Sequence, residues 1–391
     1  DNYDQDGNLL PLGYSDALAG LRGYAESDLS SSIIFSAGFN RRLYAYCEEF
    51  SDFFPDEHGN IKKKIVLKVS DFRSSVIQGK FLAKKGLWVS EYRVESGLNC
   101  GGHAFATDGY LMGPILEEFC SKKQDLFLEL FGICNRVLTE KNKQVFPTQP
   151  YVAITVQGGI GSCDEDLFLR KHYDVDGTGW ATPFLLVPEV TVLDPETRQL
   201  LVAAKEEDTY LSEISPLGIP FNTVKDTASE SQKMKRAYED GRPGSPCPKG
   251  HLVTNTTHSK KPVCRASRFY QKREIELLDQ EKGRFSEEVY NKRYFDIVNK
   301  ACLCEDLAAS FLLENNIESK RPQKTAVCPG PNVAYFKKLS TLSEMVGHIY
   351  GRLNLIQKPE SRPNMFVKEL KMYIQHIEKE LIKMLPEPDV K

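Results

Sequence analysis

The segment Tyr151–Pro188, YVAITVQGGIGSCDEDLFLRKHYDVDGTGWATPFLLVP, decides the fold class of this chain. Its first part, Tyr151–Gln157, is a β-branched apolar run that predicts a strand. The glycine-rich turn Gly158–Gly161 follows at once. A helix is predicted over Asp164–Tyr173, because three acids open this stretch and a helix N-terminus favours negative charge. The segment therefore predicts a strand, a glycine turn and a helix in succession.

A second short strand is predicted within residues 175–184, and it ends at the small residues Ala181 and Thr182. Glycine lets a ligand approach the backbone closely, and a helix N-terminus favours an anion. The glycine turn and the end of the second strand together therefore predict a phosphate site. In a (β/α)8 barrel such a site usually lies after strands seven and eight. For the glycines alone, an ordinary tight turn between strand and helix is the alternative.

The same alternation of strands and helices runs through the first half of the chain. Strands are predicted near residues 32–36, 65–69, 87–95, 151–157 and 175–184. Helical stretches follow the first two of these strands, at residues 39–50 and 72–85. Repeated strand–helix units indicate a parallel sheet with helices outside it.

Three motifs occur along this part of the chain: NCGGH at residues 99–103, GGIG at 158–161 and DGTGWATPFL at 176–185. In these motifs the chain resembles the flavin-dependent nitronate monooxygenase family and the related FMN-using enoyl-acyl-carrier-protein reductases of bacteria. Two positions depart from the family pattern. Asn99 stands where the family has an acid, and Ala181 stands where it has a glycine.

This resemblance implies an α/β fold with a (β/α)8 TIM-barrel-type flavin domain that binds FMN. Only the last five of its eight strands are found, and the polar, turn-rich residues 1–31 do not supply the first three. Open strand edges expose unpaired backbone groups. We therefore expect the chain to be the C-terminal part of a longer polypeptide, or a partner chain to complete the barrel. A smaller open α/β sheet is the alternative.

The resemblance also implies which residues form the site. His103 lies beside the flavin in the family, where it takes the α-proton of a nitroalkane or assists reduction of an enoyl thioester. The residues implied to bind the cofactor are Lys68, Gly101, Gly102, Gly158, Gly159, Gly161, Ala181 and Thr182. An imidazole titrates near neutral pH, which suits proton transfer. The alternatives are a structural histidine at position 103, bonded to a backbone carbonyl, and a solvated lysine at position 68.

Ten cysteines are present, and half of them lie in turn-rich contexts of the C-terminal half. These are Cys247, Cys264, Cys302, Cys304 and Cys328. A neighbouring proline or glycine holds the sulfur in a turn, where backbone N–H groups can point at it, as in metal thiolate sites. The interpretation is a [4Fe–4S] cluster that relays electrons to a flavin. Zinc, and free or disulfide-bonded thiols, are the alternatives, because the spacings match no standard motif.

Proline and glycine clusters at residues 216–220 and 241–250 predict a domain boundary between them, near residues 220–240. The predicted domains are an irregular N-terminal segment at 1–31, the barrel part at 32–230 and a mainly helical, cysteine-rich domain at 231–391. Helices are predicted in the last domain at 272–282, 286–300, 307–315, 333–351 and 363–384. The final helix is amphipathic and is expected to pack on its own domain or against a partner subunit.

The charge balance excludes some classes of partner. The 391 residues carry 51 basic and 54 acidic side chains, a net charge of −3, so we expect no nucleic-acid or anionic-membrane partner. No apolar run approaches the ~20 residues that span a membrane. The N-terminus shows no signal-peptide pattern. A cytoplasmic location is predicted.

These expectations combine into one functional hypothesis. The chain is predicted to be an FMN-dependent oxidoreductase that transfers a hydride or electrons at flavin N5. A small-molecule substrate, NAD(P)H or ferredoxin as electron donor, and assembly as a homo-oligomer are expected. The alternative is a non-catalytic, metal-stapled subunit that completes or regulates a partner flavoprotein.

Overall fold

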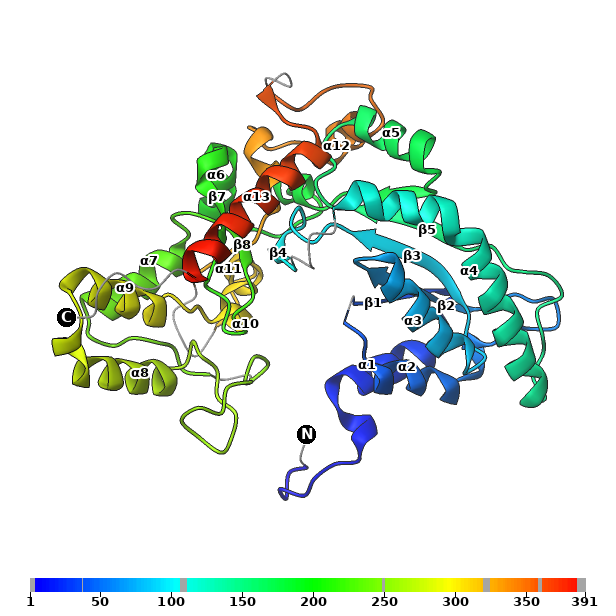
Figure 1. Cartoon of the computed structure of the whole chain (residues 1–391), viewed down its shortest axis with the longest axis horizontal. Helices are drawn as coiled ribbons and strands as arrows, with labels where there is room; N and C mark the ends of the chain where they lie inside the picture. The colour runs from blue at the N-terminus through cyan, green and yellow to red at the C-terminus, as the bar shows by residue number, and fades with distance from the viewer. Residues whose placement is uncertain are drawn as a thin grey trace. The chain divides into compact units, whose positions relative to one another are not determined.

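The computed structural model describes residues 4–36, 38–105, 111–247, 250–318, 324–357 and 361–384. The chain forms two compact units that alternate along the sequence (Figure 1). Unit 1 consists of Asp1–Glu95, Tyr110–Gln157 and Leu167–Gly179, and unit 2 of Ser96–Gly109, Gly158–Asp166 and Trp180–Lys391. This division differs from the predicted boundary near residue 231, because the segments that follow three of the strands belong to unit 2.

Unit 1 contains a parallel sheet with the strand order β1-β2-β3-β5-β6. Its strands are β1 Ser31–Phe35, β2 Lys63–Val69, β3 Val89–Glu95, β5 Ala153–Gln157 and β6 Gly177–Gly179. The prediction of an α/β fold with five parallel strands is thus confirmed. Within the described residues the sheet is open, with β1 and β6 at its edges.

The last predicted strand is shorter in the structure than in the sequence analysis. β6 ends at Gly179, and the 3-10 helix η4 Thr182–Leu186 follows it. Pro183 lies at the start of η4, where its fixed φ suits a helical turn and its missing N–H could not serve a strand ladder. The prediction that residues 180–184 continue the strand was therefore wrong.

One face of the sheet is apolar and packs against helices. The helices α3 Phe72–Ala83 and α4 Met112–Glu140 lie over this face (Figure 1). The fully buried Tyr92 stacks on Phe127 of α4, with ring centroids 6.1 Å apart. The sequence around Cys120 and Cys134 is helix-like, and α4 joins both segments into one helix whose buried residues recur at the spacing of a helix face.

The opposite side of the strands is polar. Lys68 forms an ion pair with Glu95 at 2.8 Å, and Gln157 donates a hydrogen bond to the same carboxylate at 2.9 Å. Arg93, which is the register partner of Lys68, pairs with Glu91. β3 therefore alternates buried side chains with partly exposed polar ones.

Unit 2 contains an antiparallel sheet that the sequence analysis did not predict. It has the order β4-β8-β7, with β4 Gly102–His103, β8 Phe221–Val224 and β7 Thr209–Ser212. Unit 2 also contains the helices α6 Pro195–Ala203, α7 Ala228–Tyr238, α8 Arg268–Gln280, α9 Glu287–Val298, α10 Leu303–Asp306, α11 Ala309–Glu314, α12 Leu342–Ile349 and α13 Met365–Met384. The strands are only two to four residues long, too short to show a periodic pattern.

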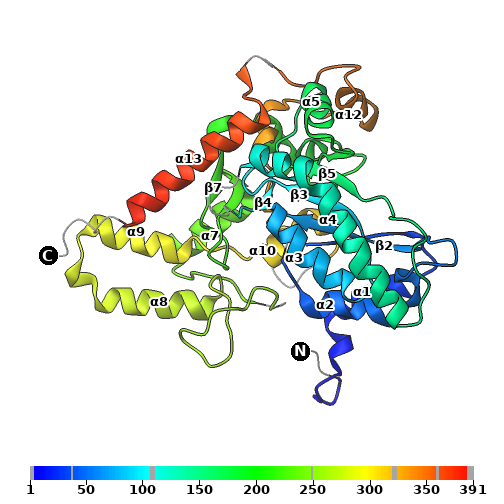
Figure 2. The ribbon, with the colours of Figure 1, turned by 45° about the vertical axis from the view of Figure 1, so that its right-hand side comes forward.

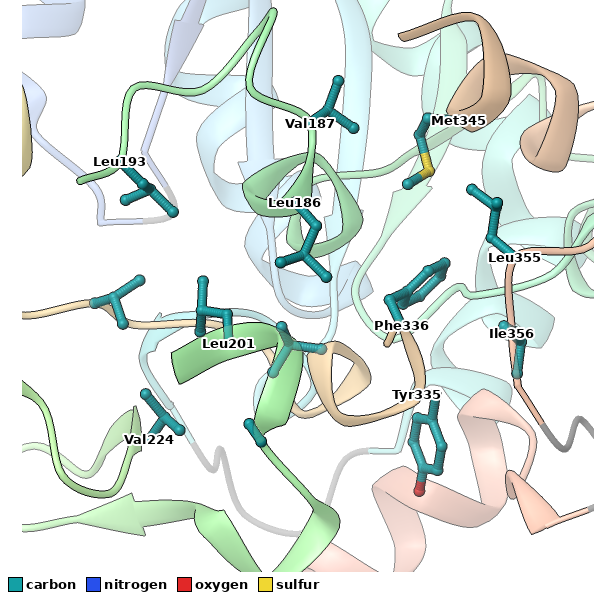
Figure 3. Packing of buried hydrophobic residues seen from close by; sticks show 13 residues of the cluster. Leu186, Val187, Leu193, Leu201, Val224, Tyr335, Phe336, Met345, Leu355 and Ile356 are labelled. Carbon is teal, nitrogen blue, oxygen red and sulfur yellow. The ribbon is translucent and has the colours of Figure 1, made fainter. Parts of the chain in front are cut away.

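A hydrophobic cluster forms the core of unit 2 (Figure 3). Leu186 and Leu201 meet Phe336 and Met345 in it. The predicted helix over 333–351 is accordingly divided. The 3-10 helix η7 Pro331–Tyr335 ends before Phe336, which turns into the core, and α12 begins after the N-cap Thr341 with a capping box to Glu344.

The N-terminal segment also differs from the prediction. Residues 1–31 were expected to be irregular, but α1 Asp16–Ala25 is a helix that buries Leu18, Leu21 and Ala25. This apolar spacing of three and four residues provides the helix with a core-facing side. Among the described residues, no helix combines the length and the apolar character that crossing a membrane requires.

Candidate functional site

The NCGGH motif forms a loop that contacts strand β8 through side-chain and backbone pairing. The side chain of Asn222 on β8 donates to the carbonyls of Leu98, at 3.0 Å, and Cys100. Gly102 and His103 pair with Asn222 and Phe221 as a short antiparallel ladder. The motif is therefore anchored by a strand that lies more than a hundred residues away in the sequence.

His103 is half-buried and neutral near pH 7. Its Nε2 lies 2.7 Å from Oγ of the fully buried Ser215, and its ring stands edge-on to Phe221 with centroids 5.0 Å apart. Burial lowers the pKa of His103 below its usual value of 6.5, because the protonated ring loses hydration. The N–H of Leu217 also donates to Ser215 Oγ, at 3.2 Å. The hydrogen-bond partner of Nε2 is thus a hydroxyl rather than a backbone carbonyl.

The glycine turn contacts the NCGGH loop directly. Gly158 and Gly159 have φ angles of 111° and 81°, a region that favours glycine. A Cβ at Gly159 would lie 2.5 Å from Nδ2 of Asn99, and one at Gly158 would lie 2.8 Å from Sγ of Cys100. The structure therefore brings two of the predicted motifs together within unit 2.

The N–H of Gly161 belongs to a buried oxyanion site whose anion comes from the chain itself. It donates to the carboxylate of Glu165 at 2.8 Å, and the N–H of Met365 at the start of α13 donates to the same carboxylate at 2.7 Å. The guanidinium group of Arg362 donates to both oxygens of the Glu165 carboxylate, at 2.8 and 2.9 Å. The side chains of Arg362 and Glu165 are only 6% and 9% exposed.

Hydrogen bonds from Asn332 and Arg362 fix the carbonyl side of the glycine turn. The amide of Asn332 donates to the carbonyls of Gly159 and Ile160 at 2.8 and 2.9 Å. Arg362 also donates to Gly159 O at 2.8 Å and to Asn332 Oδ1 at 3.0 Å. Asn332 and Arg362 were missed by sequence reasoning, because they lie some 170 to 200 residues from the turn and belong to no motif. Glu165 was noted only as one of three acids at a helix start.

Gly101 and Thr182, which were also predicted to bind the cofactor, contact the segment Cys328–Gly330. The N–H of Gly330 donates to Oγ1 of Thr182 at 3.0 Å. A Cβ at Gly101 would lie 2.4 Å from the carbonyl oxygen of Cys328. Gly101 and Thr182 therefore pack against the chain's own backbone, and in this arrangement they do not fit a bound flavin phosphate. The role predicted for Ala181, next to Thr182, stays a prediction.

Asn99 carries an unsatisfied polar atom inside this region. The residue is 2% exposed, and its Nδ2 donates to the carbonyl of Met365 at 2.9 Å. Its Oδ1 is buried and has no hydrogen-bond partner among the described residues. A buried acceptor without a donor costs about 1–3 kcal/mol. Asn99 Oδ1 is therefore a candidate acceptor for an N–H or O–H group of a ligand.

Lys68 differs from the other predicted cofactor-binding residues. It lies on β2 of unit 1, where it pairs with Glu95, whereas the loops with the three motifs belong to unit 2 or join it. The role of Lys68 at a flavin stays a prediction.

Four of the five cysteines predicted to bind metal lie near one another. Burial and the neighbouring Cys247, Cys302 and Cys304 raise the pKa of Cys264 to about 11. Within the described residues, however, no group of three or more His, Cys, Asp or Glu side chains has an arrangement that could hold a metal ion. The sulfurs as placed therefore do not fit an iron–sulfur cluster or zinc, and we derive no electron-transfer step through them.

The fifth cysteine has different surroundings. The sulfur of Cys328 accepts the N–H of Gly102, and its side chain packs against a cluster that includes Ile214 and Phe221. All ten cysteines are free thiols in the structure. Desolvation raises the pKa of Cys328, which keeps this thiol protonated at neutral pH.

His348 ties α12 to the glycine turn and predicts a pH dependence of stability. Its Nε2 bonds to the carbonyl of Gly161 at 2.9 Å, and its Nδ1 accepts the N–H of Leu355 at 3.2 Å. A proton on Nδ1 would break the second bond, and burial lowers the pKa of His348 below 6.5. Between that lowered pKa and about pH 6.5 the unfolded chain binds more protons than the folded chain. The free energy of unfolding should therefore fall as the pH is lowered through this window.

Urea unfolding at a series of pH values between about 5 and 7.5 measures this dependence. The His348→Gln variant, whose amide offers a donor and an acceptor in place of the imidazole but cannot titrate, should show a shallower slope than the wild type. An identical slope in the two proteins would assign the pH dependence to other groups. His103, whose pKa is lowered in the same direction, contributes to the slope that remains in the variant.

No protein-family model and no curated protein matches the sequence. Among solved structures, the enoyl reductase domain of MlnA, from the macrolactin biosynthesis cluster of Bacillus amyloliquefaciens, is similar with a TM-score of 0.47 and 13% identity, over 96% of this chain and 83% of that one. FabK from Thermotoga maritima is similar with a TM-score of 0.38 and 11% identity, over 89% and 70%. The corresponding values for nitroalkane oxidase from Streptomyces ansochromogenes are 0.39, 11%, 85% and 66%.

Proposed function

We propose that this chain is an oxidoreductase of the FMN-binding barrel type, in which His103 is the proton-transferring residue. The observation that supports the proposal is the convergence of the predicted motifs in unit 2. The glycine turn packs on the NCGGH loop, and the same loop presents a half-buried, neutral imidazole. The proposed substrate class is a small molecule with an acidic C–H or an activated double bond, such as a nitroalkane or an enoyl thioester.

The oxyanion site at Gly161 has the donor chemistry of a phosphate site. Backbone N–H groups and an arginine fork are the donors that proteins use for phosphate. In this structure they hold the carboxylate of Glu165. We propose that the phosphate of FMN takes the place of this carboxylate, with Gly161, Arg362 and the N–H of Met365 as its donors. The bound flavin would supply acceptance of a hydride or of two electrons.

The chain's own contribution to catalysis is the proton transfer at His103. When Nε2–H donates to Ser215 Oγ, the basic lone pair lies on Nδ1. The lowered pKa keeps this nitrogen unprotonated at neutral pH, so that it can accept a proton from a substrate carbon. Ser215 and Phe221 hold the ring in place on two sides. Asn99 Oδ1 is the further group that a ligand could satisfy.

The test of this function is the flavin content of the purified full chain, followed by two variants. We expect bound FMN, and we expect Glu165→Gln to retain it more tightly, because the variant removes the negative charge that competes with a phosphate. His103→Gln should keep the flavin and lose turnover of nitroalkanes and enoyl thioesters. Absence of flavin from both the wild type and Glu165→Gln would overturn the proposal.

A second function is favoured by the packing around the NCGGH loop. If the Glu165–Arg362 pair is purely structural, the chain is a cofactor-free subunit that supports a partner flavoprotein. The packing of Gly101 and Thr182 against residues 328–330 is the observation that favours this reading. In that case Glu165→Gln would lower stability without creating any affinity for FMN.

A further inference from the structure

The helix α13 uses one face to pack against its own unit. Met365, Met372 and Tyr373 are 1%, 7% and 5% exposed. The views in Figures 1 and 2 both place α13 beside the β7–β8 hairpin, and side chains from the helix and the hairpin line one pocket there, Met372 and Leu211 among them. The core-facing side of the helix is therefore already occupied.

A second apolar stripe runs along the other side of α13. Its members are Val367, Leu370, Ile374, Ile377, Leu381 and Met384, which are 43%, 46%, 49%, 49%, 58% and 78% exposed. They follow one another at alternating distances of three and four residues. A soluble helix that packs by one face carries charged or polar residues on the other. The stripe is thus an apolar surface that the fold of unit 2 does not explain.

The spacing of this stripe is that of the seam of a coiled coil. Alternation of three and four residues places apolar side chains at the a and d positions of a heptad, where they insert between those of a facing helix. With Val367 at an a position, the stripe fills a and d positions without interruption to Met384. A helix of 20 residues offers a seam roughly 30 Å long. The expected occupant is therefore another helix.

The charged residues beside the stripe indicate which helix packs on it. Lys371 and Glu378 stand at successive e positions, on the same flank and one heptad apart. If two copies of α13 pair antiparallel about the middle of the stripe, Lys371 faces Glu378 of the partner subunit, and the two-fold axis repeats this pair. In a parallel pair these residues would face the g positions, which hold Phe366 and Tyr373. Only the antiparallel arrangement gives opposite charges across the seam.

We propose that α13 forms an antiparallel coiled-coil contact with α13 of a second copy of this chain. Such a contact is isologous, because each helix offers the same surface to the other. Apolar burial supplies the attraction, and the two Lys371–Glu378 pairs set the direction. The inference does not depend on flavin binding.

Sedimentation of the full chain over a range of concentrations tests the proposal. The wild type should sediment as a dimer, and Ile377→Asp should sediment as a monomer with an unchanged circular-dichroism spectrum. Lys371→Glu alone and Glu378→Lys alone should each weaken the dimer about tenfold, since each replaces two attractive contacts with repulsive ones. The double variant Lys371→Glu/Glu378→Lys should restore the dimer.

The control is Lys292→Glu, a charge reversal at an exposed position of α9, which should leave the dimer unchanged. A monomeric wild type at all concentrations would overturn the proposal and leave the stripe to a different partner. A dimer that the double variant fails to restore would overturn the antiparallel pairing.

Discussion

Replacing Arg362 with methionine is expected to lower the free energy of unfolding by about 3–5 kcal/mol. Arg362 is 6% exposed and holds the equally buried carboxylate of Glu165 by two contacts, at 2.8 and 2.9 Å. Methionine keeps much of the volume but removes the positive charge. The carboxylate would then stay buried with only backbone donors, and the glycine turn would lose the contact from Arg362 to Gly159 O. Urea denaturation of the full chain measures the difference.

The matched control is Arg284→Met. Arg284 also pairs with a glutamate at 2.8 Å, but its side chain is 70% exposed and its partner Glu281 is 48% exposed. Exposed ion pairs contribute about 0–1 kcal/mol, so this variant should change stability by less than that. Equal effects at the two arginines would show that Arg362 does not hold a buried charge in solution, and the proposed oxyanion site would lose its basis.

Replacing Gly159 with alanine is expected to cost about 2–4 kcal/mol. Two independent causes add here. The φ of 81° is strained for any residue with a Cβ, and the new methyl group would lie 2.5 Å from Nδ2 of the buried Asn99. Asn99 has little freedom to move, because its amide donates to the carbonyl of Met365 at 2.9 Å. The clash should therefore push the glycine turn away from the NCGGH loop.

Thermal or urea unfolding of Gly159→Ala measures this cost, and Gly283→Ala is the control within unit 2. A Cβ at Gly283 would meet no atom within 4 Å, and its φ does not lie in the strained region. Its replacement should change stability by no more than about 0.5 kcal/mol. If Gly159→Ala is as stable as the control, the close contact between the two motifs does not exist in solution.

Local sequence patterns were sufficient to locate the parallel sheet of unit 1. β2 and β5 were predicted within two residues at each end, because β-branched apolar runs bounded by glycine and polar residues have few other structures available. The polar members of β3 alternate with the buried Tyr92 and Val94, an arrangement that the predicted strand over 87–95 did not specify. For α4, the sequence indicated helix-like segments around Cys120 and Cys134 but not the bounds of the helix.

The candidate site could be predicted only in part. The NCGGH and GGIG motifs mark the loops, and their contact in unit 2 agrees with the expectation that strand ends of a parallel sheet gather their loops in one place. The partners that decide the chemistry of the turn, Asn332 and Arg362, have no local signal. Their positions follow from how the C-terminal half folds back on the loops.

Backbone preferences and residues close in the chain were enough to predict the parallel strands of unit 1, most of the helices and the positions that must be glycine. Only the tertiary structure decided that the N–H of Gly161 binds the carboxylate of Glu165, that His103 bonds to Ser215, and that one stripe of α13 stays exposed. The physical reason is that burial, hydrogen bonding and charge pairing join residues far apart in the chain, such as Asn99 and Met365 at 266 positions, where spacing in the sequence carries no information.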